Sequence, residues 1–213
     1  MRFLLACLCF VLVIASQSRA ENEPAGEFDY YMLSLSWSPN WCKLDGDAKN
    51  SDQCDPRHDF GWVLHGLWPQ YENGWPSYCR TTAPNPPRSL TNGMADIMGT
   101  SGLAWYQWKK HGRCSGLNAE DYFATARQAF ESVQKPAVLR KVSTPLAIPP
   151  IVIEAAFIEA NPHLQPDGIT ITCKANHIQE ARICLTKLLE PRECGADVRR
   201  DCTAPSPLFT PIR

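Results

Sequence analysis

The ten cysteines of this 213-residue chain constrain its fold more than any other feature. Cys7 and Cys9 lie in an apolar N-terminal segment, and the other eight follow it: Cys42, Cys54, Cys79, Cys114, Cys173, Cys184, Cys194 and Cys202. An even number of cysteines behind a secretory leader is typical of a disulfide-bonded protein from an oxidising compartment. Because eight cysteines can pair in about a hundred ways, the sequence predicts disulfides without choosing the partners.

The N-terminal segment has the pattern of a signal peptide. Arg2 is followed by an apolar run from Phe3 to Ala15 and by a small-residue exit at Ser18-Arg19-Ala20. We therefore expect residues 1–20 to be removed by cleavage before Glu21, which makes the protein secreted or periplasmic. The run is short for a membrane span, and we expect no association with a membrane. Residues 21–213 have a normal length for a single domain with one core.

The overall charge disfavours a general nucleic-acid-binding module that tracks nucleic acid by its phosphates. Without Arg2 and Arg19, 19 basic residues face 22 acidic ones, a net charge of −3. General nucleic-acid-binding modules are usually strongly basic. The positive charge is instead local, since Lys109, Lys110 and Arg113 flank His111. No Cys-x-x-Cys pair follows the leader, so we expect no metal site.

Two histidines stand in aromatic-rich segments, His65 in HGLWP (65–69) and His111 in WKKHGRC (108–114). RNA carries its own nucleophile, the 2′-hydroxyl, and cleavage needs only a base and an acid. Histidine suits both tasks because its ordinary pKa of about 6.5 leaves both forms populated near neutrality. A fixed cation such as Lys110 would stabilise the charge of the phosphorane. We expect His58, His163 and His177 to be structural or surface residues.

These two segments resemble the active-site stretches of the ribonuclease T2 family of secreted or periplasmic endoribonucleases, which includes bacterial ribonuclease I-like proteins. The second stretch usually reads His-Glu-Trp-x-Lys-His-Gly-x-Cys. The resemblance runs from about Phe28 to Cys202 and implies cleavage of single-stranded RNA through a 2′,3′-cyclic phosphate, without a cofactor. It implies that His111 is the general base, that His65 is the general acid and that Lys110 contacts the phosphate. We expect a monomer.

Two residues depart from the family pattern. Tyr106 stands where the family usually has a phosphate-binding histidine, and Gln107 where it has an active-site glutamate. A helix over residues 104–111 would place Gln107 on one face with Lys110 and His111. An amide can donate to a phosphate, but it cannot favour a neighbouring imidazolium as a carboxylate does. We therefore predict a lower pKa for His111 than in a glutamate-containing relative.

The resemblance also implies a base-binding site and a set of disulfides. The base site would be built on Trp68 and Trp75, and Gln70 falls where some relatives have an aspartate that reads the base edge. Bases of a flexible single strand stack on such aromatics. The implied disulfides are Cys42–Cys54, Cys79–Cys114, Cys173–Cys202 and Cys184–Cys194.

Hydrophobic patterns predict the order strands, helices, strands. The predicted strands are 30–37, 62–67 with His65 at or near its end, 169–172 and 178–186. The predicted helices are 91–98, 104–111, 119–134 capped by Asn118, and 151–160. This order favours an α+β fold with an antiparallel sheet, and the family resemblance implies a small central sheet flanked by several helices.

Two other functions fit the same residues. Tyr106 and Gln107 allow a catalytically weakened or inactive member of the family that acts as an RNA-binding, signalling or defence protein. An active enzyme directed against other cells would share every residue named above. The retained His65, Lys110 and His111 favour an active enzyme over an inactive one.

Overall fold

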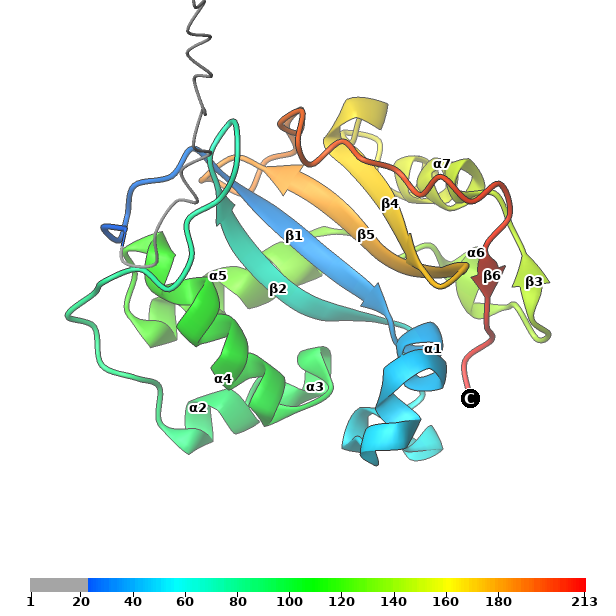
Figure 1. Ribbon diagram of the computed structural model, residues 1–213, viewed down its shortest axis with the longest axis horizontal. Coiled ribbons are helices and arrows are strands. Elements are labelled where there is room, and N and C mark those ends of the chain that lie inside the picture. The colour runs from blue at the N-terminus through cyan, green and yellow to red at the C-terminus, as the bar shows by residue number, and fades with distance from the viewer. Residues whose placement is uncertain (1–22) are drawn as a thin grey trace, which may run out of the picture.

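A six-stranded sheet forms the centre of the computed structural model, which describes residues 23–213 (Figure 1). The expected signal peptide, residues 1–20, lies outside the described residues. The strand order is β2-β1-β5-β6-β3, and β4 pairs with β5 outside this order, along most of β5. The pairs are antiparallel, apart from a single parallel contact between β5 and β6. The strands are β1 (Tyr30–Trp37), β2 (Trp62–Gln70), β3 (Leu146–Ala147), β4 (Ile169–Lys174), β5 (His177–Leu185) and β6 (Leu208–Phe209).

Seven α-helices of the described residues flank this sheet. In Figure 1 the helices α2, α3, α4 and α5 gather beside β2, while α6 and α7 lie near β3 and β4. Helix α5 packs against β1 and β2, and α7 packs against β4. The helices are α1 (Ser38–Trp41), α2 (Arg88–Asn92), α3 (Ala95–Met98), α4 (Ser101–Lys110), α5 (Ala119–Ser132), α6 (Ala137–Arg140) and α7 (Pro150–Ala160). The α+β architecture predicted from the sequence is confirmed.

Several predictions about helix starts and buried helix faces are confirmed. They depend on contacts between residues that are close in the sequence. The Asn118 side chain accepts a hydrogen bond from the Asp121 amide and caps α5. Tyr122 and Ala126 face the core from that helix. The Thr100 hydroxyl caps α4 by accepting from the Leu103 amide, so this helix begins earlier than predicted.

Two predictions about element bounds are wrong. The helix expected over 91–98 is two short helices, α2 and α3, which are interrupted at Gly93 and Met94. Glycine in a helix interior costs about 1 kcal/mol relative to alanine, which favours a break there. Strand β2 continues to Gln70, so His65 lies within the strand instead of at its end.

A bulge in β2 sets the direction of the His65 side chain. In the pairing of β1 with β2, Ser34 pairs with Gly66 and Leu35 pairs with Leu64. His65 is therefore the extra residue of β2, without a partner on β1. Beyond the bulge the alternation resumes, and both Leu64 and Leu67 belong to the main core. His65 points to the opposite face of the sheet, as a bulge that redirects one side chain allows.

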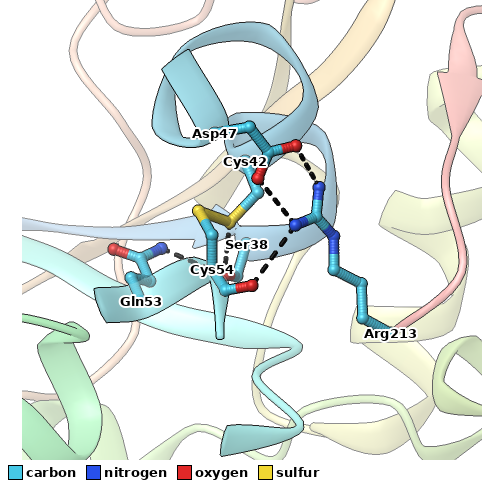
Figure 2. Close-up of a disulfide and its surroundings, with 6 residues drawn as sticks. All are labelled: Ser38, Cys42, Asp47, Gln53, Cys54 and Arg213. Carbon is cyan, nitrogen blue, oxygen red and sulfur yellow. Dashed lines mark hydrogen bonds and ion pairs between the residues drawn. A yellow bond between two sulfur atoms is a disulfide. The ribbon is translucent and has the colours of Figure 1, made fainter. Parts of the chain in front are cut away.

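All four disulfides implied by the family resemblance are present. Cys79–Cys114 joins the chain after β2 to the turn that follows α4. Cys42–Cys54 closes the segment after α1, where Arg213 donates to the Asp47 carboxylate and to the Cys54 carbonyl (Figure 2). The C-terminal residue is thereby fastened to the region that follows β1.

Removal of the Cys79–Cys114 disulfide should destabilise the fold by about 4 kcal/mol, because this bridge closes a loop of 35 residues. The control is removal of Cys184–Cys194, which closes a loop of only 10 residues and should cost about 3 kcal/mol. Urea unfolding of the two double Cys→Ser proteins measures both values. A larger loss for the control would contradict the entropic argument.

Candidate active site

All eight residues predicted for the site line one pocket of about 330 Å³. The pocket lies on the face of the sheet opposite the main core, between β2, β5 and the C-terminal part of α4. It brings together residues that are up to 46 positions apart in the sequence: His65, Trp68, Gln70, Trp75, Tyr106, Gln107, Lys110 and His111.

His65 is bonded to a buried carboxylate. Its Nδ1 donates to Oε1 of Glu180 at 2.5 Å, and the Glu180 side chain is only 1% exposed. Arg182 donates from Nε to the other oxygen, Oε2, at 2.8 Å. Burial raises the pKa of the Glu180 carboxyl, but the hydrogen bonds and charges of His65 and Arg182 outweigh burial and hold this pKa below its usual range. Glu180 is therefore an anion next to His65.

His111 has a contrasting environment. It follows the last turn of α4, where its amide donates to the Gln107 carbonyl, and it is 4% exposed. The Trp68 ring stacks on the imidazole with 4.9 Å between ring centroids. Burial, followed by the charges of Lys110 and His65, lowers the pKa of His111 to about 3. At neutral pH His111 is therefore uncharged.

Gln107 is bonded to the aromatic ring that stacks on His111. The Trp68 indole donates from Nε1 to Oε1 of Gln107 at 2.7 Å. Gly66 lies directly beneath this bond, since a Cβ at residue 66 would lie 2.2 Å from the Trp68 Nε1 and 2.5 Å from the Gln107 Oε1. The amide oxygen of Gln107 thus fixes Trp68, and its NH₂ group remains as the donor that a phosphate could use.

The remaining predicted residues form the outer part of the pocket. Tyr106 and Trp75 are exposed, and the Lys110 Nζ lies 5.9 Å from the centre of the Tyr106 ring. Gln70 is buried, and its Nε2 donates to the Pro69 carbonyl at 3.1 Å. Within residues 23–213, no carboxylate forms an ion pair with Lys110, whose charge is available to an anion in the pocket.

A second pocket of about 270 Å³ lies on the other side of His65. His65 is the one residue that lines both pockets. The second pocket is lined by Trp41, Lys49, Gln53 and Lys174 among others, and the Lys174 ammonium is paired with Asp45 at 2.7 Å. The imidazole of His65 therefore stands at the boundary between two cavities.

One group of potential metal ligands lies outside these pockets. Cys42, Asp47 and Cys54 come within ligand distance of one another. The two sulfurs are bonded to each other, and the Asp47 carboxylate is bound by Arg213 (Figure 2). Because a metal needs the free thiolate, this group is a covalent crosslink and not a metal site.

The sequence analysis missed Glu180, Arg182 and Asp197, which contribute to the site from the C-terminal part of the chain. Asp197 lines the first pocket and accepts a hydrogen bond from the Gly74 amide at 2.8 Å. The one available signal was in β5, where Glu180 and Arg182 alternate with the apolar residues Ala181 and Ile183. Two charges on a strand so rich in apolar residues indicate a specific partner.

The chain matches the model of the Ribonuclease T2 family over residues 28–194. The chain belongs to the Ribonuclease T2 family. A ribonuclease of Aeromonas hydrophila is 38% identical over 125 residues, which cover 59% of this chain and 55% of that protein. The matched region thus spans about half the length of this curated family member.

Solved structures share the fold. An RNase-related protein from Calystegia sepium superposes with a TM-score of 0.64 at 23% identity, covering 87% of this chain and 98% of that one. RNase NT in complex with 5′-AMP superposes with a TM-score of 0.56 at 20% identity, covering 88% and 100%. No helix in the described part of this family member is long and apolar enough to cross a membrane.

Gly66→Ala should disrupt the Trp68–Gln107 bond, because the added methyl group overlaps both atoms of it. We expect a loss of about 1–3 kcal/mol in the free energy of unfolding and a shift of the Trp68 indole proton resonance. Gly102→Ala on α4 is the control, since nothing lies within 4 Å of its added Cβ. An unchanged indole resonance in Gly66→Ala would contradict the close packing.

Proposed function

We propose that this protein is an endoribonuclease that cleaves single-stranded RNA by metal-independent transphosphorylation. The observation that supports it most is the pair of histidines on one pocket with opposite surroundings. His65 contacts the Glu180 carboxylate, whereas His111 is buried beside Lys110 and uncharged at neutral pH. Such a pair supplies an acid and a base at the same pH.

The steps of the proposed reaction follow from the surroundings of the two histidines. His111 takes the proton of the RNA 2′-hydroxyl, and the 2′-oxygen forms a bond to the adjacent phosphorus. The bond from phosphorus to the 5′-oxygen breaks, and His65 protonates that oxygen. The products are a 2′,3′-cyclic phosphate and a free 5′-hydroxyl. Lys110 stabilises the negative phosphorane, and the Gln107 amide and Tyr106 hydroxyl serve as neutral donors.

The two pockets provide space for nucleotides on either side of the cleaved bond. Trp68 and Trp75 would stack one base in the first pocket, with Gln70 and Asp197 at its polar edge. The second pocket would take the next nucleotide beside Trp41. RNase NT, which shares the fold, is in complex with 5′-AMP, in keeping with a nucleotide site. Bases must be unstacked to enter such pockets, which favours a single strand.

The proposal includes an oxidising location. Four disulfides and the signal-like segment over residues 1–20 support a secreted or periplasmic protein, which we propose acts as a monomer. Disulfides of this number are rare in reducing compartments.

Incubation of the oxidised protein with single-stranded RNA and a chelator should generate 2′,3′-cyclic phosphate ends. His65→Ala and His111→Ala should each lower the rate by at least about 100-fold, because each removes a proton-transfer group. His58→Ala is the matched control, since His58 is exposed and lines neither pocket. Product ends are identified by mass spectrometry.

The opposite outcomes separate the proposal from its alternative. If the parent protein binds RNA but leaves it intact at every pH, the alternative holds. The protein is then an inactive RNA-binding member of the family, and Tyr106 and Gln107 account for the lost activity. If cleavage requires a metal or leaves 3′-hydroxyl ends, the two-histidine reaction is wrong.

Gln107→Glu should move the acid limb of the profile of kcat/KM against pH to higher pH. His111 must be uncharged to act as a base, and its pKa of about 3 keeps it so down to acid pH. A carboxylate at position 107 can still accept from Trp68, but it stabilises the imidazolium and raises the pKa of His111. Kinetics between pH 3 and 7 measure the shift, and superimposable profiles would refute it.

A further inference from the structure

We infer that Glu180, held in place by Arg182, is a positioning residue that keeps His65 in the orientation of a general acid. The inference rests on the proposed function and extends it to two residues of β5. Glu180 touches His65 and does not line the first pocket. It lines the second pocket, but its side chain is only 1% exposed, and its two oxygens are bonded to His65 and Arg182. Its effect on the reaction therefore passes through the imidazole.

The contact crosses an entire strand. His65 lies on β2 and Glu180 on β5, and β1 runs between them. On the pocket face of β1 the residues at this level are Ser34 and Ser36. Ser36 pairs with Val63 on one side and with Glu180 on the other, and Ser34 pairs with Gly66 and Arg182. Two strand spacings amount to about 10 Å, which a glutamate and a histidine can bridge only over small side chains.

Orientation follows from which ring nitrogen is occupied. Since Nδ1 of His65 donates to Glu180, the other nitrogen, Nε2, is the one left to give a proton to substrate. The His65 side chain is 31% exposed, so the ring is accessible from solvent on the side away from this contact. When Nε2 has given its proton to the 5′-oxygen, Nδ1 keeps its own, and water restores the Nε2 proton after product leaves.

The carboxylate that holds the ring is itself held in place by Arg182. Arg182 binds the second oxygen of Glu180 through Nε at 2.8 Å and a terminal nitrogen at 2.7 Å, which keeps the buried carboxylate ionised and leaves Oε1 for His65. His111 has no such partner among the described carboxylates. The two histidines therefore receive different roles from their surroundings.

Other charged groups also face His65. Lys110 and His111 face it from α4 and the turn after it, and Arg182 from β5. Asp45, Lys49 and Lys174 line the second pocket, where Lys174 is paired with Asp45. Glu180 is the group in direct contact with the ring.

The test compares two substrates that differ only in their need for an acid. A dinucleotide releases an alkoxide that must be protonated, whereas uridine 3′-(4-nitrophenyl phosphate) releases a phenolate that leaves without a proton. We expect Glu180→Gln to lower kcat on the dinucleotide by at least about tenfold and to change kcat on the nitrophenyl ester by less than about threefold. His65→Ala should give the same pattern, and His111→Ala should slow both substrates.

Glu154→Gln is the matched control. Glu154 is also a buried glutamate, but it lies on α7 and lines neither pocket. It should leave both rates unchanged. Equal losses of Glu180→Gln on both substrates would mean that Glu180 only supports the fold, and would overturn the inference.

A spectroscopic measurement on the parent protein is independent of activity and of any variant's folding. The hydrogen bond from His65 to Glu180 should give a downfield proton on Nδ1 of His65 in ¹⁵N-edited NMR spectra. If the neutral ring carries its proton on Nε2 instead, the inference is wrong even if RNA is cleaved. If the downfield proton is present but no RNA is cleaved, the proposed function fails and the contact stands.

Discussion

The pairing of β1 with both β2 and β5 is the constraint on which the site depends. One face of β1 carries Leu33, Leu35 and Trp37 into the core, and the other carries Ser34 and Ser36. The large residues pack in the core between the sheet and its helices. The two serines leave room above them for side chains of β2 and β5 to meet. A single strand thus provides both the hydrophobic support of the sheet and the open floor of the pockets.

The two histidines show how surroundings assign chemical roles to identical side chains. His65 stands on a bulge, beside an anion and at the boundary of two cavities. His111 follows the last turn of a helix, is covered by the Trp68 ring and lies beside the charge of Lys110. Desolvation disfavours the charged form of the second ring, whereas the first ring is held by its hydrogen bond to Glu180. The fold produces this difference, because β2 fixes the surroundings of His65 and the end of α4 fixes those of His111.

Local signals in the sequence predicted much of the fold. The alternation of Tyr30–Trp37 and the Asn118 cap depend on neighbouring residues, and both appear where expected. The segments around His65 and His111 meet at one pocket, although His65 lies within its strand and not at its end. The family resemblance supplied the disulfide partners, which spacing alone left open. The contact between His65 and Glu180 could not be predicted, because it depends on the register of three strands and on a bulge. The break between α2 and α3 was missed because one glycine outweighed the helical pattern around it.

Different disulfides stabilise the walls of the two pockets. Cys42–Cys54 closes the segment that carries Asp45, Lys49 and Gln53 into the second pocket. Cys79–Cys114 instead joins the chain beyond Trp75 to the end of α4, and so holds the walls of the first. Each pocket therefore has its own covalent support, and the two bridges act on separate parts of the chain. Among the described residues only His65, which lines both pockets, is exposed to the effects of both bridges.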